Sequence, residues 1–212
     1  MTTPTLRVML VSPALNPALR EARFDGDTPL DPSGARAART AAPHLPAADR
    51  YAAGASGRCR ATARELGLGA PDDLEVAPEG WQLGRWSGLR LDEVAAAEPE
   101  AVAAWATRPR GRPATAGRAV GELLDRVGAW LDAGAGERRE RAPARGVVRL
   151  LAVVEPAVVR AAVTHALTLP PAAFWRLDTG PLTLTTLTGR PGRWNLATGQ
   201  PFAPAGAARG EG

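Results

Sequence analysis

The feature that most constrains the fold is the stretch Leu6–Asn16, in which an apolar run stops abruptly at Ser12-Pro13. Its composition is typical of a strand that ends in a turn of small residues. In α/β proteins, turns at the carboxyl edge of the sheet present the groups that bind ligands or catalyse reactions. A second apolar run, Val147–Val154, contains only one charged residue, Arg149. This run is suited to the centre of a parallel sheet that is buried on both faces.

The remaining pattern predicts strands that alternate with helices in a single domain over residues 1–200, followed by a disordered tail over 201–212. Ser33 is expected to cap the first long helix through its hydroxyl group. The last two strands are expected to be edge strands, and the Arg-, Pro- and Gly-rich segments 108–118 and 134–145 to be mobile. Strands are expected at Asp49–Ala53, 73–77, Leu182–Leu187 and Arg193–Leu196, and helices at 34–42, Ser56–Arg64, Asp92–Trp105, Val120–Leu131 and Pro156–Leu167.

Composition excludes several classes of function. The 26 basic residues are balanced by 22 acidic ones, so the net charge of +4 gives little support to nucleic-acid binding. The single cysteine, Cys59, permits no internal disulfide, and this favours a reducing cytoplasm. No apolar run is long enough to span a bilayer, and the start of the chain lacks a signal-peptide pattern. Two histidines and one cysteine form no metal-binding pattern, so we expect no metal and no cofactor.

Four strings in the chain resemble the histidine phosphatase superfamily, which has the phosphoglycerate mutase-like fold. They are R-F-D-G-D-T-P-L-D-P-S-G (23–34), S-G-R-C-R-A-T-A (56–63), L-G-R-W-S-G-L (83–89) and A-A-F-W-R-L-D-T-G-P-L-T-L-T-T-L-T-G-R-P-G-R-W-N-L (172–196). The resemblance covers about residues 5–197. It implies a three-layer α/β/α sandwich with a mostly parallel central sheet and an active site at the carboxyl ends of the strands.

Members of this family transfer phosphoryl groups through a phosphohistidine, and the resemblance assigns their catalytic positions here. A neutral imidazole attacks phosphorus, and cations stabilise the charge on the phosphoryl oxygens. The nucleophile position of the family's R-H-G turn falls on Pro13, which has no side-chain lone pair. The first phosphate-binding arginine of the family is replaced by Ser12. Arg58 matches the second phosphate-binding arginine.

Two further family positions also depart from the pattern. The second histidine falls on Glu155, and the general acid falls on Gly80, with Glu79 one residue away. A carboxylate at position 155 would repel a phosphate dianion but would attract Arg58. We therefore expect Glu155 and Arg58 to form a salt bridge.

The resemblance, with these replacements, predicts a degenerate histidine phosphatase-fold protein that has lost phosphatase and mutase activity and acts as a ligand-binding or regulatory protein. A small molecule is the expected partner, and neither nucleic acid nor membrane is; a homodimer is left open, because no interface can be identified. Trp86, beside Trp81, is a second candidate for stacking on a ligand at the pocket rim. The candidate ligand-binding residues are Ser12, Asn16, Arg58, Glu79, Trp81 and Glu155.

Two alternatives remain open at this point. The first is a repurposed enzyme, for instance of specialised metabolism, in which Glu155 is the general acid or base and Arg58 orients an anionic substrate. The second is residual phosphatase activity through an unforeseen nucleophile. We expect neither His44 nor His165 to be catalytic, because both lie away from the strand edge. Cys59 is expected to pack inward from its helix.

Overall fold

The computed structural model describes residues 5–25, 27–107, 120–133 and 146–198. The predictions of mobile segments at 108–118 and 134–145, and of a disordered tail at 201–212, lie outside the described residues.

The described residues form a six-stranded mixed sheet with the strand order β3-β2-β4-β1-β5-β6. Neighbouring strands from β3 to β1 run parallel, whereas β5 is antiparallel to both β1 and β6. The central, mostly parallel sheet is the one predicted. The strands are β1 (Thr5–Val11), β2 (Arg50–Ala53), β3 (Glu75–Val76), β4 (Val147–Val153), β5 (Leu184–Arg190) and β6 (Arg193–Ala197).

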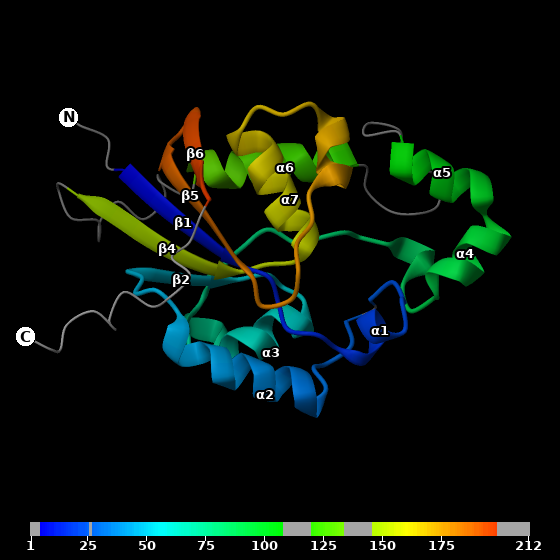
Figure 1. Ribbon diagram of the computed structural model, residues 1–212, viewed down its shortest axis with the longest axis horizontal. Helices are drawn as coiled ribbons and strands as arrows, with labels where there is room; N and C mark the ends of the chain where they lie inside the picture. The colour runs from blue at the N-terminus through cyan, green and yellow to red at the C-terminus, as the bar shows by residue number, and fades with distance from the viewer. Residues whose placement is uncertain (1–4, 26, 108–119, 134–145, 199–212) are drawn as a thin grey trace, which may run out of the picture.

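Helices cover both faces of this sheet, as expected for an α/β/α sandwich (Figure 1). The helices α2 and α3 lie on one face, and α6 and α7 lie on the other; α4 and α5 extend beyond one end of the sheet. Among the helices of the described residues, none has the length and apolar composition of a membrane span. The helices are α1 (Pro17–Arg20), α2 (Pro32–Ala41), α3 (Gly57–Glu65), α4 (Leu91–Ala97), α5 (Pro99–Thr107), α6 (Val120–Ala133) and α7 (Pro156–Ala166).

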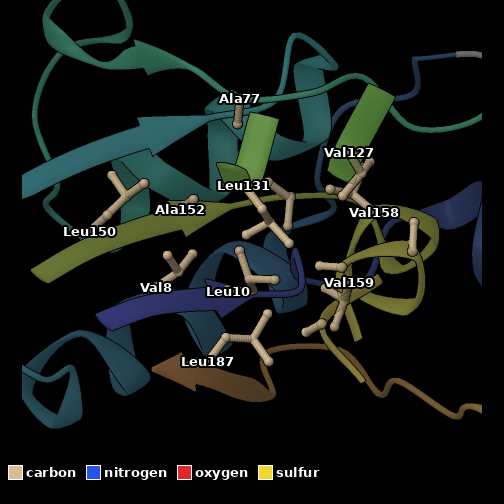
Figure 2. Close-up of a cluster of buried hydrophobic side chains, with 14 of the residues drawn as sticks. Val8, Leu10, Ala77, Val127, Leu131, Leu150, Ala152, Val158, Val159 and Leu187 are labelled. Carbon is tan, nitrogen blue, oxygen red and sulfur yellow. The ribbon is translucent and has the colours of Figure 1, made fainter. Parts of the chain in front are cut away.

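The apolar run of β1 supplies both cores, because side chains of a strand alternate between the two faces of a sheet. Val8 and Leu10 pack against α6 and α7, whereas Met9 and Val11 pack against α2 and α3. Figure 2 shows Leu10 beside Val159 of α7, within the first of these cores. The same alternation holds in β4, so the two central strands fix the layered fold.

Two local predictions were wrong. The side chain of Asp31, not of Ser33, caps α2 by accepting a hydrogen bond of 2.6 Å from the backbone N–H of Gly34. Ser33 instead lies within the helix and donates its hydroxyl hydrogen to Asp31. The strand β5 is not an edge strand, because it pairs with both β1 and β6. Its threonine-rich sequence resembled an edge, yet Leu187 is fully buried and its neighbour Thr186 is buried as well.

We expect Leu10→Ala to lower the free energy of unfolding by about 2–5 kcal/mol, because it removes a fully buried side chain and leaves a cavity in the core. The matched control is Leu91→Ala, since Leu91 is 44% exposed and should change stability by less than about 0.5 kcal/mol. Urea unfolding followed by circular dichroism measures both. Equal effects of the two substitutions would contradict the assigned core.

Candidate functional site

A cavity of about 580 Å³ opens at the carboxyl ends of β2 and β4. Gly54 and Ala55 follow β2 directly and line it, as does Glu155, which follows β4. Ligands of α/β proteins bind at this edge of the sheet. The cavity is therefore the candidate functional site. It lies at the carboxyl edge of the sheet, but no residue of Leu6–Asn16 lines it.

Arg58 and Glu155 form an ion pair at this cavity, and this confirms the prediction. The Nη2 atom of Arg58 donates to Oε2 of Glu155, and Nε lies 3.4 Å from Oε1. The hydroxyl of Ser56, the N-cap residue of α3, also donates to Oε1 at 2.7 Å. The Arg58 side chain is only 3% exposed and that of Glu155 is 19% exposed. Such a charge-assisted pair is strong because little water competes for it.

A second carboxylate, that of Asp25, lies 3.6 Å from Nε of Arg58. Asn16 holds this carboxylate through a hydrogen bond of 2.7 Å from its Nδ2 atom, and the backbone N–H of Thr28 donates to the other oxygen. One guanidinium therefore faces two carboxylates. The charge of Arg58 is fully compensated within the protein.

Two candidate ligand-binding residues, Ser12 and Asn16, do not line the cavity, and neither does Pro13 at the nucleophile position. Ser12 is fully buried, and its hydroxyl donates to the carbonyl of Gly180 and accepts from the backbone N–H of Thr183. Pro13 is buried beside it. Asn16 caps α1 through Oδ1 in addition to holding Asp25. Ser12 and Asn16 thus fix the turn after β1 rather than offering groups to a ligand.

Gly80 lines the cavity directly against Glu155. A Cβ atom on residue 80 would lie 2.8 Å from Cβ and 2.9 Å from Cγ of Glu155, too close for any side chain. The neighbouring Glu79 is exposed at the cavity, where it accepts a hydrogen bond from Gln82 at 3.0 Å. Arg126 fixes the backbone here by donating to the carbonyls of residues 79 and 80. A side chain at position 80 therefore does not fit while Glu155 keeps its present position.

Aromatic side chains form one wall of the cavity. Trp81, Trp105 and Phe24 line it, and the rings of Trp81 and Trp105 lie 5.6 Å apart. Trp86 stacks on Phe24 behind this wall and is fully buried, so the prediction that it could stack on a ligand was wrong. The sequence could not separate Trp81 from Trp86, because both lie within the same glycine- and tryptophan-rich segment, Glu79–Leu89.

Cys59 and His44 offer no reactive group to the cavity. Burial raises the pKa of the Cys59 thiol, and the nearby carboxylate of Glu155 raises it further, so the thiol stays protonated. Its inward packing on α3 was predicted. His44 is exposed in the turn Ala42–His44, away from the cavity. Among the described residues, no group of three or more histidines, cysteines or carboxylates could hold a metal ion.

His165 lies in a second cavity, of about 480 Å³, between α6, α7 and β6. Its Nε2 atom is 3.0 Å from the Asp132 carboxylate, which also accepts from the indole N–H of Trp194 at 3.0 Å and the backbone N–H of Gly192 at 3.2 Å. The ring packs on Gly128, where a Cβ atom would lie 2.5 Å from Nδ1. These contacts join two helices to the last hairpin and are structural.

Trp105 and Arg160 are among the lining residues of the first cavity that sequence reasoning missed. Arg160 lies in α7, four residues after Pro156, and residues at this spacing share one face of a helix. That spacing was the available signal. Trp105 follows Trp81 by 24 positions along the chain, and no local pattern joins them.

A mostly parallel sheet that carries its site at the carboxyl ends of central strands defines an α/β protein of the phosphoglycerate mutase-like class. The chain belongs to the histidine phosphatase superfamily (branch 1), whose family model matches residues 16–200. A comparison with curated protein sequences finds no match.

Solved structures show the same fold. "Mycobacterial hydrolase 1" is 22% identical with a TM-score of 0.74, over 92% of this chain and 97% of that chain. A mycobacterial glucosyl-3-phosphoglycerate phosphatase is 22% identical with a TM-score of 0.73, over 90% and 96%. A mutant phosphoserine phosphatase from Entamoeba histolytica is 17% identical with a TM-score of 0.72, over 91% and 95%.

We expect Gly80→Ala to destabilise the protein by about 1–3 kcal/mol, because the new methyl group collides with Glu155. In a Glu155→Gly background the same substitution should cost less, since both contacting carbons are gone. The double-mutant cycle is measured by urea unfolding. Gly54→Ala is the matched control, because its Cβ atom would lie at an ordinary 3.4 Å from its nearest neighbour. Equal costs of Gly80→Ala in the two backgrounds would contradict the proposed collision.

We expect the carboxylate of Asp132 to make a contribution to stability that is lost in acid. Burial raises the pKa of its carboxyl, but the hydrogen bonds from Trp194 and Gly192 and the nearby His165 lower it more, so the pKa lies below its usual range. A pKa lowered by folding stabilises the protein above about pH 4 and ceases to do so as the pH falls through the folded value.

We therefore expect Asp132→Asn to flatten the loss of unfolding free energy between about pH 5 and pH 2. Urea unfolding at a series of pH values measures the slope. Asp72→Asn, at an exposed carboxylate, is the control and should leave the slope unchanged. A slope unaffected by Asp132→Asn would contradict the acid-sensitive contribution of Asp132 to stability.

Proposed function

We propose that this protein has lost phosphohistidine-based phosphatase and mutase activity and binds a small molecule, as a ligand-binding or regulatory protein, in the cavity at the carboxyl ends of β2 and β4. The observation that carries the proposal is the ion pair of Arg58 with Glu155. The carboxylate accepts from Arg58 and Ser56. An internal group thus occupies the arginine that would otherwise bind a phosphoryl oxygen.

The nucleophile position supports the loss of activity. The resemblance assigns this position to Pro13, and proline offers no lone pair with which to attack phosphorus. Pro13 is also buried and does not line the cavity. The segment matched by the family model begins at residue 16, after this turn. Neither His44 nor His165 lines the cavity to replace the missing group.

Electrostatics also disfavour a phosphate ester. Arg58 faces the carboxylates of Glu155 and Asp25, so this end of the cavity carries a net negative charge. Like charges about 4 Å apart repel by about 4 kcal/mol at an effective dielectric constant of about 20. A phosphate dianion at Arg58 would be attracted by one cation and repelled by two carboxylates.

The ion pair weighs against a repurposed enzyme of specialised metabolism as well. In that alternative Arg58 orients an anionic substrate and Glu155 moves a proton, but each group already holds the other.

Residual activity through Cys59 is disfavoured because the thiol is buried and protonated. The phosphatases among the similar structures share the fold, whereas activity depends on site residues. A cytoplasmic location is part of the same proposal.

We expect the protein to show no turnover of p-nitrophenyl phosphate above the uncatalysed rate, because none of the described residues that line the cavity is a histidine. A colorimetric assay at neutral pH with the full chain measures this. Arg58→Ala is the control, and turnover that this substitution abolishes would overturn the proposal.

Removal of the internal carboxylate should reopen the old anion site. We expect Glu155→Ala to bind orthovanadate at least about tenfold more tightly than the unaltered protein, measured by isothermal titration calorimetry. Glu79→Ala is the matched control, since it also removes a cavity carboxylate but not one paired with Arg58. Tight vanadate binding by the unaltered protein would show that Glu155 does not block the site.

A further inference from the structure

Among the described residues, one arginine of the cavity has no partner for its charge. Three arginines line it, and two of them form ion pairs: Arg58 with Glu155 and Asp25, and Arg23 with Glu21. The guanidinium of Arg160 forms no hydrogen bond or ion pair within the described residues, and its Nε atom is buried. A buried donor without a partner costs free energy that a bound acceptor would recover.

A second hydrogen-bond donor that lines the cavity is also buried without an acceptor. The indole N–H of Trp105 is buried and has no acceptor among the described residues. Trp105 lines the cavity together with Trp81 and Phe24, whose rings supply an apolar surface. The cavity thus combines aromatic walls with two donors that need an acceptor. Pockets that bind small organic ligands have this composition.

The sign and number of charges on the ligand narrow its chemical class further. An ammonium group brings only donors, so it satisfies neither Arg160 nor the Trp105 indole. A phosphate dianion meets one free cation but also the carboxylates of Asp25 and Glu155. A carboxylate brings a single negative charge and several acceptor lone pairs, and one guanidinium can bind it through two hydrogen bonds.

From these observations we propose that the cavity binds an aromatic monocarboxylate, with its ring against Trp81 and Trp105 and its carboxylate on Arg160. This assignment rests on the proposed function, because it takes Arg58 to be occupied by Glu155. The anion-binding arginine would then be Arg160 of α7 in place of Arg58 of α3. The exposed carboxylates of Asp27 and Glu79 at the same cavity would disfavour ligands with further negative charge.

Four naphthalene derivatives of matched shape test the proposal: the carboxylate, the carboxamide, the methylammonium and the phosphate monoester. Each is titrated into the full chain at neutral pH by isothermal titration calorimetry. We expect the carboxylate to bind at least about tenfold more tightly than each of the other three. Tighter binding of the amide or the ammonium, or no binding of the carboxylate at millimolar concentration, would overturn the assignment.

Substitutions in the cavity test whether the carboxylate of the ligand binds to Arg160. Arg160→Gln should weaken binding of the naphthalene carboxylate by about tenfold or more, whereas Arg160→Lys, which keeps the charge, should retain part of the affinity. Arg60→Gln is the matched control, because Arg60 is an exposed helical arginine outside the cavity. Trp105→Phe keeps an aromatic ring but removes the indole N–H, and should weaken the carboxylate more than the amide. Unchanged affinity in Arg160→Gln, with thermal unfolding as in the unaltered protein, would contradict the proposal.

The phosphate monoester separates this inference from the proposed function. Tight binding of naphthyl phosphate that Arg58→Ala abolishes would show that the old phosphate site still operates, and both proposals would fail. Failure of the carboxylate to bind, with no turnover of phosphate esters, would overturn the ligand class alone.

Discussion

The ion pair of Arg58 with Glu155 is the interaction on which the rest of the site depends. Its guanidinium is almost completely buried, so water stabilises the charge poorly and the protein itself must supply the counter-charge. Glu155 and Asp25 do so from two different segments, and Ser56 adds a hydrogen bond to Glu155. Removal of one partner would leave a buried charge, which is costlier than removal of both. The pair therefore joins the helix after β2 to the turn after β4.

This pairing also explains why position 80 is glycine. The Glu155 side chain passes so close to Gly80 that even a methyl group there would collide with it. The resemblance places the general acid of the family at the same position. While Glu155 keeps the position that reaches Arg58, an acid at position 80 does not fit without a shift of one of the two residues.

Sequence reasoning recovered the layered fold and the ion pair but not the full cavity. The two central strands were evident because their apolar runs alternate between two buried faces, and Arg58 and Glu155 follow neighbouring strand ends. Ligand binding by Ser12 and Asn16 stays a prediction. Both satisfy backbone groups in the structure, as polar residues at a strand end can do. Arg160 and Trp105 were missed because the place of both at one cavity depends on tertiary packing, and only Arg160 had a local signal, its spacing from Pro156.

The separation of fold from site has a physical basis in this molecule. Both cores are built from alternate residues within β1 and β4, whereas every group that lines the cavity lies in a turn, a loop or a helix beyond the strands. Replacement of edge residues therefore leaves the packing of the sheet intact. The same edge still presents a cation, because α7 begins directly after Glu155 and carries Arg160 in its second turn. An anion site can thus pass from α3 to α7 at the same edge of the sheet without any change of fold.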